Sequence, residues 1–177
     1  MNEQELFERA KNVRLLILDV DGVMTDGSII LDNHGNELKA FHVRDGHGIK
    51  MLQKVGIEIA IITGRISDVV ERRARELGIQ HVYQKALKKA VAYEELRVKT
   101  GVPANEIACI GDDIVDIPIL RRVALPVAVA DATEETKAAA VYVTKAPGGR
   151  GAVREICDLI LRANGKWDEL FDAYSHG

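Results

Sequence analysis

Two aspartates stand one residue apart at the end of an apolar run in the segment LLILDVDGVMTDG, residues 15–27. In extended backbone, residues i and i+2 point to the same side, so Asp19 and Asp21 can face one reactant. One carboxylate can then attack while the other transfers protons. Buried carboxylates are costly unless they are paired, hydrogen-bonded or bound to a metal, so the pair also predicts a cationic group nearby.

Further polar residues follow other strand-like segments. The segment IITGR places Thr63, Gly64 and Arg65 after a strand, and ALKKAV offers Lys88 and Lys89 where a helical pattern begins. In an open parallel sheet, such groups gather at the carboxyl ends of the strands. A third strand-like segment, IACIGDDIVD, contributes acidic residues to the same edge. These are Asp112, Asp113 and Asp116.

The combination of these groups predicts a phosphate site beside a metal. Several carboxylates that converge on one spot cannot all stay ionised without a cation, and oxygen ligands suit a hard ion such as Mg²⁺. The Thr63 hydroxyl and the Lys89 ammonium are donors suited to a highly charged oxyanion. A lone Asp-x-Asp is more often a solvated turn, so the prediction depends on all four elements occurring in this order.

The alternation of strand-like and helical segments predicts the fold that positions these residues. Near-continuous apolar strands separated by helices are typical of a parallel sheet that is covered on both faces. We predict an α/β, three-layer, Rossmann-like fold. The expected strands are 14–20, 57–63, 81–83, 106–112, 125–130 and 141–144, and the expected helices are 48–56, 67–78, 88–101, 116–123, 133–140 and 151–165.

One segment, about 27–43, breaks the alternation. Two strand patterns, Ser28–Leu31 and Glu37–Val43, flank the turn-rich DNHGN and predict a β-hairpin. Its first strand is apolar on both faces, and a two-stranded ribbon alone in water is marginal, so we expect it to pack against another subunit. The remaining chain fits a single domain, 1–177, with a C-terminal tail at about 166–177 whose placement is open.

Composition excludes several classes of protein. No segment approaches the ~20 apolar residues that span a bilayer, and the N-terminal segment lacks the apolar stretch of a secretion signal. We therefore expect a cytoplasmic protein without a membrane partner. A formal net charge of −3 argues against nucleic-acid binding. Cys109 and Cys157 lie in apolar patterns, where packed thiols are expected.

The motifs together resemble the haloacid dehalogenase (HAD) superfamily of phosphotransferases. DVDGVMTDG is similar to its first motif, IITGR to its second, Lys89 to its third and GDDIVD to its fourth, so the resemblance covers residues 14–165. It implies that Asp19 is the nucleophile, forming an aspartyl phosphate, and that Asp21 is the general acid and base. True dehalogenases lack the second aspartate and the metal, so Asp21 favours phosphate chemistry.

The same resemblance implies the remaining roles. Mg²⁺ would be held by Asp19, the backbone carbonyl of Asp21 and Asp112. Thr63 and Lys89 would hold the transferring phosphoryl group. Large cap domains of this superfamily enter between the first three motifs, where this sequence has room only for the hairpin, helices and a short strand, so we predict no cap domain. Two acidic residues would orient Lys89 and metal-bound water, namely Asp113 and Asp116.

The hairpin, the following VRDGHGIK and the ending APGGRGAVREICDLIL resemble the branch that dephosphorylates 3-deoxy-D-manno-octulosonate 8-phosphate (KDO 8-P), a step toward lipopolysaccharide in Gram-negative bacteria. Members of that branch form homotetramers in which hairpins meet in a barrel and subunits cover each other's sites. The resemblance implies substrate contacts from a loop at His42–Gly46 and from cations near the site. The candidates are Asp21, His42, Val43, Arg44, Asp45, Gly46, Lys50, Gly64, Arg65, Arg73 and Lys89.

Three alternatives stay open at this point. A phosphatase of nonulosonate 9-phosphates would share the architecture, although such relatives tend to carry Glu in place of Arg65. A non-catalytic oligomerisation or regulatory domain would need none of the acidic residues or Lys89. A signalling receiver domain also uses Asp, Thr and Lys around Mg²⁺, but its first acidic pair is adjacent rather than spaced by one.

Overall fold

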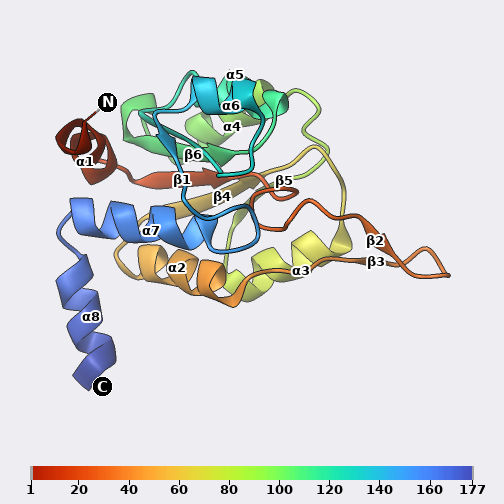
Figure 1. Ribbon diagram of the computed structural model, residues 1–177, viewed down its shortest axis with the longest axis horizontal. Helices are drawn as coiled ribbons and strands as arrows, with labels where there is room; N and C mark the ends of the chain where they lie inside the picture. The colour runs from red at the N-terminus through yellow and green to blue at the C-terminus, as the bar shows by residue number, and fades with distance from the viewer. Residues whose placement is uncertain (1, 177) are drawn as a thin grey trace.

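The computed structural model describes residues 2–176, so the first and last residues of the predicted range 1–177 lie outside the described chain. Within it, parallel strands form a six-stranded sheet in the order β5-β4-β1-β6-β7-β8, between two layers of helices (Figure 1). The predicted α/β three-layer fold is confirmed. The strands are β1 Leu15–Leu18, β4 Glu58–Ile62, β5 His81–Tyr83, β6 Ile107–Gly111, β7 Leu125–Ala128 and β8 Tyr142–Val143.

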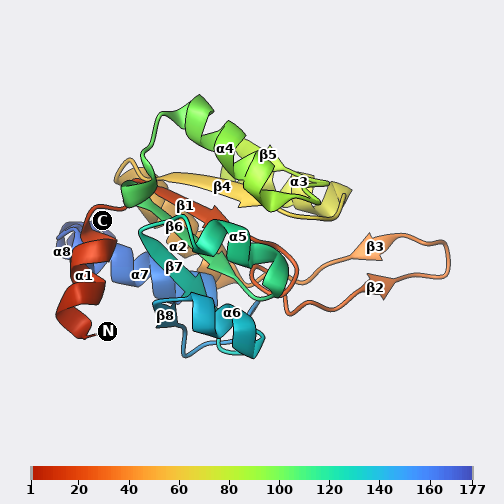
Figure 2. The ribbon, with the colours of Figure 1, turned by 90° about the horizontal axis from the view of Figure 1, so that it is seen from above.

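The helices divide between the two faces of the sheet, as Figures 1 and 2 show. One face carries α1 Glu3–Lys11, α2 Val43–Lys54, α3 Asp68–Leu77 and α7 Ala152–Ala163. The other face carries α4 Lys89–Thr100, α5 Ile117–Leu120 and α6 Glu134–Ala139. Two short 3-10 turns, η1 Ala104–Glu106 and η2 Ile114–Asp116, flank β6, and α8 Trp167–His176 follows α7.

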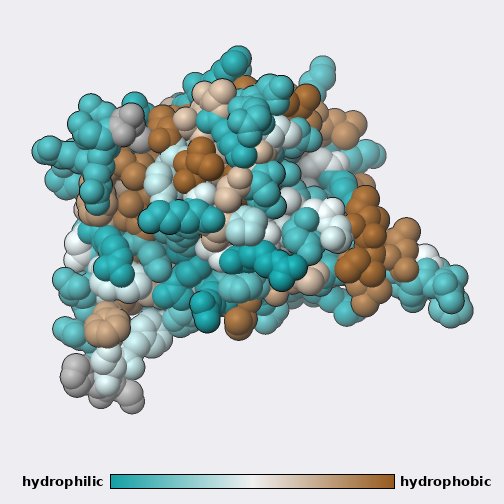
Figure 3. All heavy atoms as spheres, viewed as in Figure 1, coloured by the Kyte–Doolittle hydropathy of each residue, from teal (hydrophilic) through white to brown (hydrophobic). Residues whose placement is uncertain are grey.

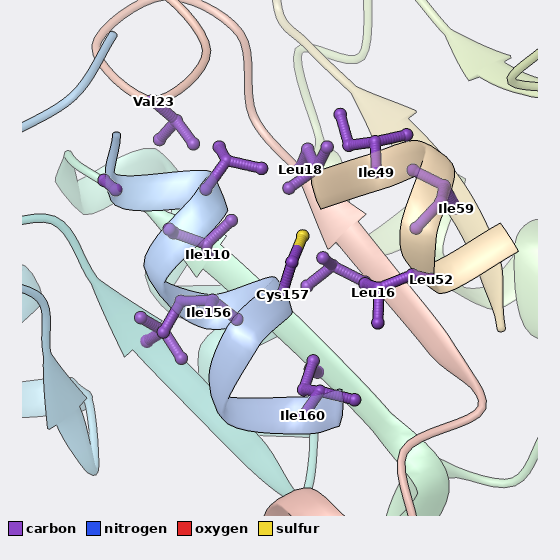
Figure 4. Packing of buried hydrophobic residues seen from close by; sticks show 14 of the residues in the cluster. Leu16, Leu18, Val23, Ile49, Leu52, Ile59, Ile110, Ile156, Cys157 and Ile160 are labelled. Atoms are coloured by element: carbon purple, nitrogen blue, oxygen red, sulfur yellow. The ribbon is translucent and has the colours of Figure 1, made fainter. Parts of the chain in front are cut away.

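Side chains of β1 alternate between two cores because successive residues of a strand point to opposite faces. Leu16 and Leu18 pack among residues of α2 and α7, including Cys157 (Figure 4). Leu15 and Ile17 pack on the opposite face with residues of α4 and α5. Both faces of β1 are therefore buried, which accounts for its uninterrupted apolar sequence.

The order of the strands creates a switch point at β1. The chain leaves β1 for β4, pairing Leu15 with Glu58, and later returns to the other side of β1, where Leu15 pairs with Ile107 of β6. In open parallel sheets, the crevice at the carboxyl ends of the strands beside such a reversal is where ligands bind. Asp19 is the first residue after β1 at this crevice.

The structure corrects the predicted boundaries around the hairpin. The paired segments are only β2 Ile30–Leu31 and β3 Glu37–Leu38, and α2 begins at Val43 rather than at residue 48. His42 has extended backbone and acts as the N-cap, while Asp45 lies in the first turn, where the helix dipole favours an acid. The exposed Val43 therefore begins a helix despite its strand preference.

The hairpin projects from the body of the protein and is apolar at its base (Figures 1 and 3). Ile29, Ile30, Leu31 and Leu38 are all exposed. At the C-terminal end, the described residues of the predicted tail form α8. The guanidinium of Arg162, in α7, lies 3.8 Å from the ring centroid of Trp167, the first residue of α8. None of the helices described across residues 2–176 is long and apolar enough to span a membrane.

Candidate active site

Asp19 and Lys89 form the buried centre of the site. The Asp19 N–H donates to the Ile110 carbonyl at 3.3 Å, so the aspartate is held at the end of the sheet between β1 and β6. Lys89, the first residue of α4, places Nζ 2.9 Å from Asp19 Oδ1 and 2.6 Å from Asp116 Oδ1. The ammonium group of Lys89 therefore connects α4 with two segments remote in sequence, the end of β1 and the turn η2.

Burial and charge set the ionisation of this centre. Burial and the neighbouring Asp116 raise the pKa of Asp19 to about 6, although Lys89 opposes the shift. Burial lowers the pKa of Lys89, but the two carboxylates raise it by more, so its pKa lies above the ordinary lysine value. Lys89 is thus a permanent cation at neutral pH.

Asp112 and Asp116 follow β6 and differ in their partners. Asp116 Oδ2 accepts hydrogen bonds from the backbone N–H groups of Asp112 at 3.1 Å and Asp113 at 3.4 Å. Asp112 has no ion pair with Lys or Arg among the residues described. Burial, followed by the charges of Asp19 and Asp116, raises the pKa of Asp112 to about 7.

These carboxylates fit a divalent cation. Oxygen atoms of Asp19, Asp112 and Asp116 lie within 4.8 Å of one another. Both oxygens of Asp116 are already occupied by Lys89 and backbone N–H groups. Asp112 and the Asp19 oxygen that does not contact Lys89 are therefore the better candidates to coordinate a metal. An all-oxygen donor set of like charge, with elevated pKa values, is suited to Mg²⁺.

The turn after β1 is packed too tightly for any side chain at Gly22. This residue has φ +86°, and a Cβ atom there would lie 2.1 Å from Asp112 Oδ2. Gly148, from the loop before α7, packs against the same turn, because its Cβ would lie 1.7 Å from the Gly22 carbonyl oxygen. The Gly149 N–H also donates to the Val23 carbonyl at 2.8 Å. Close backbone packing therefore fixes the turn that carries Asp21.

A cleft of about 370 Å³ opens beside this centre. The loop after β4 contributes Thr63, Gly64 and Arg65, and the segment before α4 contributes Ala86 and Leu87. The predicted residues of the four motifs thus meet in one place, as expected from the parallel sheet. The remaining lining residues are Asp19, Asp21, Gly27, Lys89, Asp112, Asp113 and Val115.

The sequence analysis did not identify Lys39 and Glu37, which join the hairpin to the site. Lys39 Nζ forms an ion pair with Asp21 and lies 3.3 Å from Glu37 Oε1. Glu37 Oε1 is also 2.7 Å from Arg65 Nη2, and Glu37 accepts a hydrogen bond from Ser67 Oγ. The Ser67 hydrogen bond is the main cause that lowers the pKa of Glu37. The charged residues Glu37 and Lys39 in the second strand pattern of the hairpin were the sequence signal that could have identified this connection.

Several predicted substrate contacts do not line the cleft. Residues 43–46 form the first turn of α2 rather than a loop, with Val43 and Arg44 exposed. Asp45 is buried, and its Oδ1 accepts a hydrogen bond from the Arg154 N–H at 2.8 Å, so it caps α7. The helical conformation of these residues follows from the earlier start of α2, and their contacts with a substrate stay a prediction.

Three further candidates, His42, Arg73 and Lys50, also lie away from the cleft within this chain. The His42 Nδ1 atom is buried without a hydrogen-bond partner. Arg73 pairs with Glu76 at 2.9 Å, and its Nη2 would lie 2.3 Å from a Cβ at Gly46. Lys50 lies beside Gly78, at the far end of α3 from the cleft. Asp113, in contrast, lines the cleft; it is exposed and caps η2 by accepting a hydrogen bond from the Ile114 N–H.

The switch-point cleft with its carboxylates and lysine defines a hydrolase of the HAD-like class, and the family model described as haloacid dehalogenase-like hydrolase matches residues 76–156. The chain is 51% identical over 165 residues to the 3-deoxy-D-manno-octulosonate 8-phosphate phosphatase KdsC of Escherichia coli K12, covering 93% of this chain and 88% of that protein. The chain therefore belongs to the family of the KdsC phosphatases.

Solved structures agree with this membership. The phosphatase of the same name from Yersinia pestis matches with a TM-score of 0.92 and 52% identity, covering 93% of this chain and 89% of that one. The phosphatase from Moraxella catarrhalis, in complex with magnesium ion, phosphate ion and KDO, matches with a TM-score of 0.96 and 42% identity, covering 98% and 99%.

Proposed function

We propose that this protein is a Mg²⁺-dependent phosphatase that hydrolyses KDO 8-P through an aspartyl-phosphate intermediate. The observation that carries the proposal is the convergence of Asp19, Asp21, Thr63, Lys89 and Asp112 on one cleft. The name and bound ligands of the Moraxella catarrhalis relative support the same substrate. The product would be the free sugar acid and inorganic phosphate.

In the first step, an Asp19 oxygen attacks phosphorus, the bond from phosphorus to the sugar oxygen breaks, and Asp21 gives its proton to that oxygen. In the second step, water attacks the same phosphorus and gives a proton back to Asp21, and the bond from phosphorus to Asp19 breaks. Asp19 is suited to attack because it contacts Lys89, a permanent cation that offsets the negative charge of the site.

Thr63 and Lys89 would donate hydrogen bonds to the transferring phosphoryl group. These donors would replace the hydrogen bonds that the phosphoryl oxygens make with water. Asp19, the Asp21 backbone carbonyl and Asp112 would hold Mg²⁺, with Asp116 orienting Lys89 at 2.6 Å. When bound, the ion would neutralise negative charge shared by the carboxylates and the phosphate.

Arg65 supports a substrate with a carboxylate. It lines the cleft, stays partly exposed and pairs there with a carboxylate of the chain, Glu37. A guanidinium has five donors and can bind a second carboxylate beside the first. A nine-carbon sugar acid esterified at its 9-position is the competing substrate, since it carries the same carboxylate.

The exposed hairpin supports assembly with other copies of the chain, and the homotetramer is what the resemblance implies. Four exposed apolar residues on a two-stranded ribbon are unfavourable in water and favour burial against other subunits. Val43 and Arg44, exposed at the start of α2, would then be available to a neighbouring subunit's cleft. This assembly would cover the cleft that lies beside the hairpin.

Phosphate release from KDO 8-P and from the nine-carbon 9-phosphate, with Mg²⁺ and with a chelator, tests the proposal. We expect Mg²⁺-dependent preference for the eight-carbon ester, and loss of activity in Asp19→Asn. Asp68→Asn, at the start of α3 and outside the cleft, is the matched control. Preference for the nine-carbon ester would replace the substrate, and release from neither sugar by folded protein would favour a non-catalytic domain.

A further inference from the structure

Lys39 is buried at the base of the hairpin and is assigned no role by the motifs. Only 1% of its side chain is exposed. A buried ammonium is costly unless carboxylates surround it, and two do so here: Asp21 in the turn after β1 and Glu37 in β3. The lysine therefore ties the hairpin to the residue expected to transfer protons.

The contact leaves Asp21 available to a ligand. Lys39 binds Oδ1 of Asp21, while the Asp21 side chain keeps 23% of its surface exposed and lines the cleft. The hydrogen bond from Lys39 thus holds Asp21 Oδ1 on the side of the hairpin and restricts rotation of the carboxyl group. This is how a supporting hydrogen bond orients a functional side chain.

Glu37 extends the same connection to the other side of the cleft. It contacts Lys39 at 3.3 Å and Arg65 at 2.7 Å through the same oxygen, Oε1, and accepts a hydrogen bond from Ser67 with its other oxygen. The chain of contacts Asp21–Lys39–Glu37–Arg65 therefore crosses from the turn after β1, through the hairpin, to the loop after β4.

We propose that Lys39 is a positioning residue for Asp21, and that Glu37 anchors Lys39 and Arg65 together so that the hairpin base aligns proton transfer with substrate binding. This inference rests on the proposed phosphatase activity. It adds a residue that is not among those lining the cleft and that acts on the reaction through the Asp21 side chain.

The proposal predicts a dependence on the leaving group. When the bond from phosphorus to oxygen breaks, a sugar alkoxide needs the Asp21 proton, whereas p-nitrophenolate departs without one. A misplaced Asp21 therefore slows transfer from alkyl esters far more than transfer from p-nitrophenyl phosphate. General distortion of the site would slow both reactions by similar factors.

The experiment compares kcat/KM for KDO 8-P, phenyl phosphate and p-nitrophenyl phosphate in the wild type, Lys39→Met and Lys39→Arg. We expect Lys39→Met to lose about 100-fold or more with KDO 8-P, the scale of general acid catalysis, and less than about 10-fold with p-nitrophenyl phosphate. Lys39→Arg should recover much of the loss. Lys99→Met, an exposed position on α4, is the matched control.

A double-mutant cycle provides the second test. If Lys39 acts through Asp21, Asp21→Asn and the double variant Asp21→Asn/Lys39→Met should have the same kcat/KM with KDO 8-P. Equal losses on all three esters, or additive losses in the cycle, would overturn the proposal. Lys39→Arg retains the charge and keeps the test valid if Lys39→Met unfolds in a thermal scan.

The aryl esters separate this inference from the proposed function. If the wild type hydrolyses both aryl phosphates but not KDO 8-P, the substrate is wrong, and the ratio between phenyl and p-nitrophenyl phosphate still tests Lys39. If it hydrolyses none of the three esters with Mg²⁺ present, the phosphatase proposal fails first and the Lys39 proposal fails with it.

Discussion

The ammonium nitrogen of Lys89 lies 2.9 Å from Asp19 Oδ1, with both side chains buried. The same nitrogen lies 2.6 Å from Asp116 Oδ1. One cation thus compensates two carboxylates taken from the ends of β1 and β6, and it stands where a phosphoryl group attached to Asp19 would need a donor. Stability and activity are therefore coupled at Lys89.

Lys89→Met should reduce both quantities. The variant leaves two buried carboxylates without their cation, which typically costs about 3–5 kcal/mol in the free energy of unfolding. Loss of a donor to the transferring group should lower kcat by about 10²–10³. Urea unfolding and phosphate release measure the two effects, with Lys99→Met as the control. Unchanged stability at neutral pH would contradict the ion-pair argument.

Mg²⁺ binding should strengthen as pH rises. Folding raises the pKa of Asp19 to about 6 and of Asp112 to about 7 from 3.8. Between pH ~4 and ~7 the metal-free folded protein therefore holds more protons than the unfolded chain, so its stability falls with rising pH. Mg²⁺ favours the ionised carboxylates and should release protons on binding.

Calorimetric titration with Mg²⁺ in buffers of different ionisation enthalpy measures that proton release. We expect a larger increase in Tm on adding Mg²⁺ at about pH 8 than at about pH 6. Asp112→Asn should remove most of the pH dependence along with most of the affinity. Equal Mg²⁺ affinity at both pH values would mean that these carboxylates are already ionised without the metal.

Gly148→Ala should disturb the turn after β1. The added Cβ would lie 1.7 Å from the Gly22 carbonyl oxygen, which is backbone and cannot rotate away. Overpacking of this kind costs about 1–3 kcal/mol, and displacement of Gly22 should also weaken Mg²⁺ binding through its contact with Asp112. Thermal unfolding with and without Mg²⁺ measures this. Gly64→Ala, whose Cβ meets nothing within 4 Å, is the stability control.

Asp45→Ala should act on stability rather than on substrate binding. Asp45 Oδ1 accepts from the Arg154 N–H at 2.8 Å, and α7 has no side-chain hydrogen bond from its own N-cap, Gly151. Loss of this cap should cost about 1–2 kcal/mol, and Asp45→Asn should cost less because an acceptor remains. A large rise in KM for KDO 8-P without loss of Tm would restore the original substrate-binding prediction.

Charge on the hairpin should dissociate the proposed tetramer. Leu31 and Leu38 are 60% and 52% exposed, and Leu31→Glu/Leu38→Glu would place two charges in the expected interface. Light scattering at micromolar concentration should show smaller particles with lower activity on KDO 8-P. Val98→Glu, at a more exposed apolar position on α4, is the control. A monomeric wild type with full activity would contradict the assembly.

Much of the fold and the centre of the site could be predicted from local sequence patterns. The apolar strands indicated a parallel sheet, and each of the six predicted strands forms within the described residues. Because parallel strands end at one edge, the residues Asp19, Thr63 and Asp112 had to meet there. Asp21 also lines the cleft, but it lies in the turn after β1 and not in extended backbone, so the two-residue period did not place it.

Contacts between remote segments were decided only in the tertiary structure. The start of α2 at Val43, and with it the burial of Asp45, depends on the N-terminus of α7 more than 100 residues later. The position of Lys39 depends on where a hairpin folds back over the turn after β1. Local pattern encodes which face of an element is apolar, whereas the partner of a buried charge is selected by packing across the whole chain.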